Sequence, residues 1–407
     1  MNTIQIKSGK EKQLVTHHPW VFSGAIESQE GTQPGVCKVL KSDGSFLAWG
    51  WWDEKSHIPV HLLSWNETDQ IDDNWWKHTV AASVLRRRSF FDSDGSTTAF
   101  RIIFSEADML PGIVADVYGT TIRIVISARV GWDQKDKVVE TLDKMLHPHL
   151  MVITTDHNFL SIEGLKDTTS YYSNGQYFTP ESRLEAISFK EDGLVYETIP
   201  GGGQKSDFYC DQRDNRKKIE KYCKGKNVLD GFSYTGGFTL HALRAEAQSV
   251  YSLDSSEPAL HGLLRNIHLN EDKGTLPEGS RQRCTTKCCN VFEEMRNITK
   301  DQFDVMVLDP PKLAKTKGQA EKAARAYKDL NRLAMEKIRD NGIIATFSCS
   351  SAIDAAMLRT ILAWASIDAR CEVQVLEILS AGSDHPVRLS FPESEYLCGY
   401  ILRVLKH

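Results

Sequence analysis

The sequence predicts an α/β protein whose C-terminal half forms a doubly wound parallel sheet. From about residue 195 onward, short β-branched runs alternate with helical segments, which is the order of repeated βα units. The chain has 407 residues, of which 41% are hydrophobic and 25% are charged, so it is long enough for two or three hydrophobic cores. We therefore expect a globular protein with more than one domain.

The first domain, residues 1–72, is predicted to be a small β-barrel-like module. This stretch is rich in Gly and Trp, and it contains short alternating apolar segments at 35–40 and 45–52, as expected for short strands. After Asp72, which is suited to capping a helix, apolar residues recur at spacings of three and four as far as Arg88. We expect this helix to open a second domain.

The second domain, residues 73–192, is predicted to be α+β. β-branched runs at 121–126 and 151–155 flank one amphipathic stretch at 133–145. The expected order is therefore strands, helix, strands.

The third domain, residues 193–407, carries the predicted parallel sheet. Its strand-like runs alternate with helical ones and lie at 227–230, 249–254, 283–286, 303–309 and 342–347. The tail adds two runs, 372–379 and 396–405, with no helix between them. That ending suits an antiparallel hairpin that closes the sheet.

Composition excludes several classes of protein. The N-terminus has no apolar region typical of a secretory signal, and no apolar run approaches the roughly 18 residues of a membrane span. We therefore expect a cytoplasmic protein without a membrane partner. Nine scattered cysteines indicate reduced thiols. The one local group, Cys284, Cys288 and Cys289, has no paired C-x-x-C arrangement and no evident fourth ligand, so we expect no metal site.

Charge alone does not announce a nucleic-acid binder. The net charge is −5 and the pI is near 6.2, which weighs modestly against an RNA substrate. Local basic runs, at 86–88 beside two phenylalanines and at Lys312, Lys315 and Lys317, could still contact phosphates. Solvated helix faces explain such runs equally well.

Two strand-end motifs carry the chemistry. Asp309 follows the run at 305–308 and precedes two prolines, and Cys349 follows the run at 342–348 among small polar residues. If both strands lie in one parallel sheet, the two side chains emerge at the same carboxyl edge, where open α/β sheets bind ligands. A thiol beside a carboxylate suggests covalent catalysis. The alternative for Cys349 is a small buried hydrophobic residue, as most free cysteines are.

A strand, a glycine-bearing loop and a helix start between residues 228 and 243 predict a cofactor site. The spacing departs from G-x-G-x-x-G, which disfavours a nicotinamide dinucleotide. Asp254 ends the next run at the distance typical of a carboxylate that binds a ribose diol, and Asn290 follows the third run with an amide oxygen suited to an adenine amino group. Each residue alone also suits capping. Together, in sheet order, they indicate a nucleoside cofactor.

The motifs DGFSYTGGF, SLDSSEPAL, NVF, LDPPK and FSCSS resemble those of class I S-adenosylmethionine-dependent RNA methyltransferases. The resemblance covers nearly the whole chain and is strongest to the bacterial large-subunit rRNA cytosine-5 methyltransferase group. The segment at 17–26 resembles the opening of that group's PUA domain, an RNA-binding β-barrel, and the segment at 105–116 resembles its central α/β domain. The family implies a Rossmann-like catalytic sheet. It also implies RNA as the partner, and 23S rRNA is the RNA that we expect.

The resemblance also assigns a site. The segment at 204–216 is similar to the family's approach to the catalytic domain, where two residues border the pocket for S-adenosylmethionine. Three positions depart from the family pattern: Asp207 replaces the usual glycine, Cys210 the usual leucine and Asn290 the usual aspartate. The residues expected to bind the cofactor are Gln212, Arg213, Asp230, Phe232, Tyr234, Gly236, Gly237, Asp254, Asn290 and Asp309.

Methylation of carbon 5 of cytosine needs a cysteine, because this carbon is a poor nucleophile until a thiolate adds at carbon 6. We expect Cys349 to be the nucleophile and Asp309 to bind the ring nitrogen or amino edge of the cytosine. On the substrate side, Pro310 and Pro311 would stiffen the loop. Lys312 would hold a phosphate or lower the pKa of the thiol.

Two alternatives remain open at this point. A guanine-nitrogen methyltransferase would share the sheet and the proline pair but would need no thiol. A non-catalytic RNA-binding factor would use the sheet only as a scaffold. Residues that could stack on an extruded base are Tyr327, Phe347 and His385, each of which suits a core or surface role as well. The sequence leaves the oligomeric state open, with a homodimer as one alternative.

Overall fold

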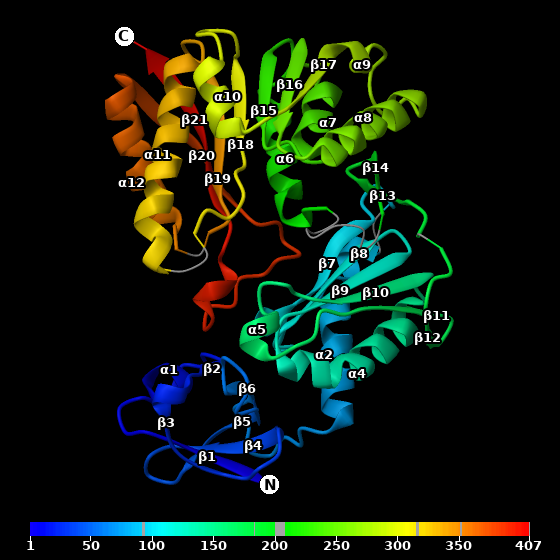
Figure 1. Ribbon diagram of the computed structural model, residues 1–407, viewed down its shortest axis with the longest axis vertical. Coiled ribbons are helices and arrows are strands. Elements are labelled where there is room, and N and C mark those ends of the chain that lie inside the picture. The colour runs from blue at the N-terminus through cyan, green and yellow to red at the C-terminus, as the bar shows by residue number, and fades with distance from the viewer. Residues whose placement is uncertain (92–93, 183, 200–207, 315–316, 351, 407) are drawn as a thin grey trace. The chain divides into compact units, whose positions relative to one another are not determined.

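The computed structural model divides into two compact units, each assembled from separate stretches of chain (Figure 1). The first unit contains Met1–Ile187 and Asp384–Ser394, and the second contains Ser188–Thr198, Phe208–Ser383 and Glu395–His407. The structure describes residues 1–91, 94–182, 184–199, 208–314, 317–350 and 352–406.

The N-terminal module of the first unit is built around a six-stranded sheet. Its strand order is β2-β6-β5-β4-β1-β3, and apolar side chains such as Ile4, Val39 and Trp52 form its core. The predicted β module is confirmed. Its elements are β1 (Asn2–Ile6), α1 (Lys12–Val15), β2 (Trp20–Val21), β3 (Ile26–Glu30), β4 (Gly35–Leu40), β5 (Phe46–Trp52) and β6 (Val60–Ser64).

A second six-stranded sheet follows, with the order β12-β11-β10-β9-β8-β7. Asp72 caps the predicted helix by accepting a hydrogen bond from the backbone N–H of Trp75 at 2.9 Å. The predicted order of strands, helix, strands is confirmed, although the helix begins four residues earlier, at Arg129. The elements are α2 (Asp73–Arg86), α3 (Arg88–Phe91), β7 (Ala99–Phe104), β8 (Ile113–Tyr118), β9 (Thr121–Ile126), α4 (Arg129–Leu146), β10 (Leu150–Thr155), α5 (Leu160–Glu163), β11 (Thr169–Ser173) and β12 (Gln176–Phe178).

A segment from late in the chain completes the first unit. The carboxylate of Asp384 accepts a hydrogen bond from the backbone N–H of Arg101 at 2.8 Å. Arg388 donates from Nη1 to the carbonyl of Glu106 at 2.9 Å, and the ring of Phe391 packs edge-on to Trp20. The segment Asp384–Ser394 is therefore anchored on residues of the first 106 positions of the sequence.

The second unit contains a seven-stranded sheet with the order β17-β16-β15-β18-β19-β21-β20. Five strands are parallel, while β21 runs antiparallel to both β19 and β20, so the predicted hairpin that closes the sheet is confirmed. The strands of the sheet are β15 (Asn227–Gly231), β16 (Ser249–Asp254), β17 (Cys284–Cys288), β18 (Val305–Leu308), β19 (Ile343–Ser348), β20 (Cys371–Ser380) and β21 (Cys398–Lys406). A separate two-stranded sheet consists of β13 (Ile187–Glu191) and β14 (Leu194–Thr198).

Helices cover this sheet, with α7 and α8 beside β16, and α11 and α12 beside β19 and β21 (Figure 1). Strands β18 and β19 are buried along their whole length, as expected for parallel strands covered on both faces. The helices are α6 (Arg213–Glu220), α7 (Gly237–Arg244), α8 (Glu257–Asp272), α9 (Ser280–Arg283), α10 (Val291–Asn297), α11 (Ala320–Lys337) and α12 (Ala355–Ala369). Among the described residues, no helix is long and apolar enough to cross a membrane.

The sheet has a topological switch point at β15. The chain moves outward from β15 to β16 and β17, and then returns to the other side of β15 to form β18 and β19. Open α/β sheets bind their ligands outside the carboxyl ends of the strands at such a point.

Candidate active site

The predicted site residues gather at the carboxyl edge of the switch-point strands. Asp230 lies near the end of β15, and Asp254 ends β16. Asp309 directly follows β18, and Cys349 directly follows β19. Because β18 and β19 are adjacent and parallel, with Leu308 paired to Thr346, the expectation that the thiol and its carboxylate emerge at one edge is confirmed.

The thiol of Cys349 lies against the proline loop. Its Sγ donates a hydrogen bond to the carbonyl of Pro310 at 3.8 Å. Burial raises the pKa of Cys349 to about 12, and the carboxylates of Asp309 and Asp211 add to the rise, whereas Lys312 lowers it. Lys312 thus acts in the predicted direction, but burial and the two carboxylates outweigh it. The resting side chain is a thiol rather than a thiolate.

The carboxyl of Asp309 is balanced between its two protonation states. Burial raises its pKa to about 7, and the neighbouring charge of Asp211 adds to the rise. The nearby amide of Gln212 and the positive charge of Arg216 oppose the shift. A carboxyl with a pKa near neutrality can both accept and donate a proton during one reaction cycle.

The glycine loop after β15 has an unusual backbone. Phe232 and Tyr234 adopt left-handed conformations with φ of 66° and 48°, and Gly236 has φ of 90°. A side chain at Gly236 would also meet Leu263, since an added Cβ would lie 2.7 Å from its Cγ atom. Asn266 of α8 steadies the loop by donating to the carbonyl of Thr235 at 3.0 Å. Strained non-glycine residues held in this way are typical of functional loops.

Two acidic side chains frame this loop. Asp254 accepts backbone hydrogen bonds from Tyr234 at 2.9 Å and from Ser256 at 2.8 Å. Asp230 is only 1% exposed, and its Oδ2 accepts from the hydroxyl of Thr239 at 2.6 Å. Its Oδ1 is buried without a hydrogen-bond partner in the described part of the chain. Burial, aided by the charge of Asp254, raises the pKa of Asp230 to about 7.

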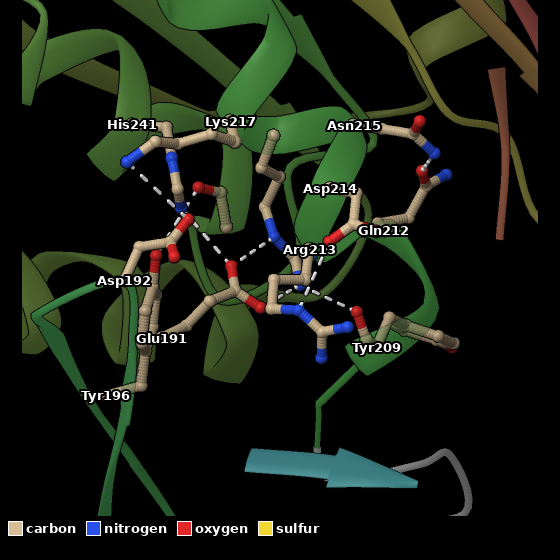
Figure 2. Close-up of polar contacts among 12 residues, drawn as sticks. Glu191, Asp192, Tyr196, Tyr209, Gln212, Arg213, Asp214, Asn215, Lys217 and His241 are labelled. Carbon is tan, nitrogen blue, oxygen red and sulfur yellow. Dashed lines mark hydrogen bonds and ion pairs between the residues drawn. The ribbon is translucent and has the colours of Figure 1, made fainter. Parts of the chain in front are cut away.

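Gln212 and Arg213 lie at the start of α6, where both are buried (Figure 2). The side-chain oxygen of Gln212 accepts from Nδ2 of Asn215 at 2.7 Å, while its Nε2 is buried and makes no well-formed hydrogen bond to any residue described. Arg213 pairs with Asp214 at 3.3 Å. The amide of Gln212 lies close enough to Asp309 to oppose the rise of its pKa. Unpaired buried polar atoms are costly in a folded protein, so Oδ1 of Asp230 indicates a polar ligand.

A buried charge network holds the helices that carry these residues. Glu191 of β13 accepts two hydrogen bonds from Arg216, at 2.6 and 2.7 Å, and lies 3.2 Å from Nε2 of His241 (Figure 2). Burial opposes ionisation of Glu191, but Arg216 and His241 outweigh it and lower its pKa to about 2. On the other side of the ring, Nδ1 of His241 contacts Glu220 at 2.5 Å. The network ties β13, α6 and α7 together.

The structure places the remaining predicted residues unequally. Asn290 is exposed and caps α10, accepting from the backbone N–H of Phe292 at 3.1 Å. Pro311 and Lys312 are exposed on the loop after β18, whereas Pro310 is buried. Asp207 lies outside the described residues, and Cys210 is buried.

The suggested stacking residues do not suit that role. Tyr327 and Phe347 are fully buried in the core, and His385 is 3% exposed within the first unit. All three are aromatic, and the sequence carries no signal of how deeply they pack.

Sequence reasoning missed one charged residue of the site. Asp211 directly precedes Gln212, is 8% exposed, and acts electrostatically on both Asp309 and Cys349. The only available signal was an acidic residue beside the two residues already expected to border the pocket.

Comparisons with known proteins are consistent with this geometry. A model of PUA-like domains matches residues 4–65, and a model of S-adenosylmethionine-dependent methyltransferases matches residues 165–367. Ribosomal RNA large subunit methyltransferase I of Photobacterium profundum is 34% identical over 402 residues, which cover 98% of each chain. The protein of the same name from Vibrio vulnificus is 34% identical over 407 residues, covering 99% of each chain. The chain belongs to the ribosomal RNA large subunit methyltransferase I family.

Solved structures show the same fold. SMU.776, described as a methyltransferase and solved in complex with SAH, covers 99% of this chain with a TM-score of 0.82 at 18% identity. A SAM-dependent methyltransferase from Streptococcus mutans covers 99% of this chain with a TM-score of 0.80. The Rossmann-like methyltransferase fold with an N-terminal PUA-like domain is therefore confirmed for this member of the methyltransferase I family.

The cofactor of this family member is S-adenosylmethionine. Its charge suits the site, because the cofactor carries a sulfonium and an ammonium group while the carboxyl edge of the sheet carries the side chains of Asp230 and Asp309. This edge also carries Oδ1 of Asp230, which is buried without a hydrogen-bond partner among the described residues. Within the described residues, no group of three or more His, Cys, Asp or Glu side chains is arranged to hold a metal ion.

Proposed function

We propose that the protein methylates carbon 5 of a cytosine in RNA, with 23S rRNA as the expected substrate, through a covalent adduct to Cys349. One observation carries the proposal: the thiol of Cys349 lies at the cofactor edge of the sheet, hydrogen-bonded to the loop that begins with Asp309. The names of the relatives support rRNA as substrate, and the PUA-like domain supports binding to RNA. A guanine-nitrogen methyltransferase would have no use for this thiol.

The cofactor is held, in this proposal, by the loop and the carboxyl edge. Asp254 would bind the ribose hydroxyls, and Asp230 would offer its unpaired Oδ1 to the polar end of the cofactor. The full set is Gln212, Arg213, Asp230, Phe232, Tyr234, Gly236, Gly237, Asp254, Asn290 and Asp309. When bound, S-adenosylmethionine supplies an electrophilic methyl group, which carbon 5 accepts.

Asp309 moves the proton that activates the thiol. Because the resting thiol keeps its proton, its addition to carbon 6 needs a base at hand. Asp309, which is half ionised near pH 7, accepts the proton of Cys349 and passes it to nitrogen 3 of the cytosine as the C6–S bond forms. Protonation at nitrogen 3 makes carbon 6 more electrophilic, so the thiolate adds there. The adduct then has a nucleophilic carbon 5. Pro310 and Pro311 hold this loop, and the exposed Lys312 can meet a phosphate of the RNA.

Trapping the adduct tests the proposal directly. The wild-type protein with S-adenosylmethionine should form a complex with RNA containing 5-fluorocytosine that survives denaturing electrophoresis, because fluorine at carbon 5 cannot leave as a cation. The matched control is the same RNA with unmodified cytosine, which should be released as 5-methylcytosine. Methylation of a guanine nitrogen, with no trapped complex, would contradict the proposal and favour the rival enzyme.

Cofactor affinity should depend on pH through Asp230. Its raised pKa of about 7 means that the carboxyl is neutral below that pH and charged above it. A cationic ligand binds the charged form better, so binding of S-adenosylmethionine should tighten as the pH rises from about 6 to about 8, by up to roughly tenfold in total and mostly below pH 7. Calorimetric titration across this range measures the change.

Two controls identify the group responsible. S-adenosylhomocysteine lacks the sulfonium charge, so its affinity should change less over the same pH range. Asp230→Asn should flatten the profile for the methyl donor. An unchanged profile in that variant would assign the pH dependence to another group.

A further inference from the structure

Asp211 is a buried carboxylate with one unused oxygen. It lies in the 3-10 turn Cys210–Gln212 that leads into α6, and it is 8% exposed. Its Oδ2 accepts a hydrogen bond from the hydroxyl of Tyr396 at 2.5 Å, and its backbone carbonyl accepts from the N–H of Gly382 at 2.9 Å. Its Oδ1 is buried and has no hydrogen-bond partner among the described residues. The side chain is thus fixed in place with one acceptor unsatisfied.

The charge of Asp211 acts on the catalytic pair predicted from the sequence. Its charge raises the pKa of Asp309 and of Cys349. It is not among the principal influences on Asp230, whose neighbouring charges are Asp254 and Arg216. Asp230 also acts on Asp309 but is not among the principal influences on Cys349, so Asp211 is the second carboxylate that acts on the thiol, beside which the substrate base must lie.

The proposed reaction leaves one proton without an acceptor. After methylation, carbon 5 carries both a methyl group and its original hydrogen, and Cys349 is still bonded to carbon 6. Release requires a base to take that hydrogen as a proton. Asp309 has by then passed its proton to nitrogen 3 and lies at that edge of the ring, so a second carboxylate is needed at carbon 5.

We propose that Asp211 is the base that removes the carbon 5 proton, an assignment that rests on the proposed cytosine-5 reaction. The C5–H bond breaks and its proton goes to Oδ1 of Asp211. The electron pair of that bond forms the C5–C6 double bond, and the C6–S bond breaks with its electron pair leaving on the sulfur of Cys349. The nitrogen 3 proton then returns through Asp309 to the thiolate, and the proton on Asp211 passes to solvent, which restores the resting site.

Asp211→Asn tests the assignment because the amide keeps the shape and can still accept from Tyr396 but is not basic. This variant should add to RNA and transfer the methyl group, and then fail to release the product. With ordinary cytosine RNA and methyl-labelled cofactor, it should give a labelled protein–RNA complex on denaturing gels, while turnover falls at least about 100-fold. Asp214→Asn, the same change three residues along, should give no trapped complex. Asp211→Glu, which restores a carboxylate, should recover part of the release.

The outcomes separate this inference from the proposed function. If wild-type protein forms the 5-fluorocytosine complex but Asp211→Asn turns over normally, the base is a different group and the inference is wrong. It is equally wrong if Asp211→Asn binds S-adenosylhomocysteine with wild-type affinity but forms neither adduct nor product, since Asp211 would then act before methyl transfer. If wild-type protein forms no adduct at all, the cytosine-5 reaction itself fails.

Discussion

Replacing Cys349 with alanine is expected to reduce methyl transfer by about 10⁴-fold or more, while cofactor binding stays unchanged. The reason is chemical: without a thiol to add at carbon 6, carbon 5 of cytosine has too little electron density to accept a methyl group. The thiol lies at the end of β19 against the carbonyl of Pro310, so its removal leaves the glycine loop and the acidic residues of the cofactor side in place. Incorporation of labelled methyl groups into RNA measures the first effect, and thermal stabilisation by S-adenosylhomocysteine measures the second.

A neighbouring cysteine provides the matched control. Cys398 is buried in β21 and pairs with Ser348, the residue before Cys349. Cys398→Ala removes a similar thiol from the core, so it should lower stability by about 1 kcal/mol or somewhat more and leave methyl transfer largely intact. Methylation retained by Cys349→Ala would rule out the covalent mechanism, whatever the control does.

Replacing Arg216 with methionine should lower the free energy of unfolding by about 3–5 kcal/mol, which is large for a single substitution. The guanidinium is 4% exposed and its partner carboxylate on Glu191 is fully buried. Removing the cation takes away the largest influence that keeps Glu191 ionised, and leaves the contact with His241. Denaturant unfolding of the cofactor-free protein should show a lower midpoint. The variant should also bind cofactor less well, because Arg216 stabilises the charged forms of Asp230 and Asp309.

An exposed lysine on the same helix calibrates this result. Lys217 lies 3.9 Å from Asp192 and is more than half exposed, so Lys217→Met should cost less than about 1 kcal/mol. The double variant Glu191→Gln with Arg216→Met removes both charges and should recover much of the stability lost in Arg216→Met alone. Equal losses in the single and double variants would show that packing, rather than an unpaired buried charge, causes the effect.

The parts of the site that could be predicted from sequence are those that depend on strand order. Asp309 and Cys349 each follow an apolar run, and parallel strands bring such positions to one edge whatever the details of packing. The glycine loop and Asp254 were found by the same logic. The division into three domains stays a prediction, as do the individual cofactor contacts.

Properties that depend on tertiary burial could not be predicted from sequence. The raised pKa of Cys349 results mainly from desolvation, which no local pattern reveals. The network of Glu191, Arg216 and His241 joins three elements that are separate in the sequence. Asn290 suited both a cap and an adenine contact, and only the structure shows that its oxygen caps α10.

The position of the segment Asp384–Ser394 has a consequence for synthesis of the protein. This segment belongs to the first unit, where Asp384 and Arg388 bind residues of the N-terminal half. At typical rates of translation, residues 188–383, which separate it from the earlier part of this unit, take about 10–40 s to make. During that time, the N-terminal half emerges from the ribosome without the side chains that complete it. We expect the first unit to reach its final protease resistance only after residue 394 has left the exit tunnel, so a nascent chain stalled before that point should be cleaved more readily.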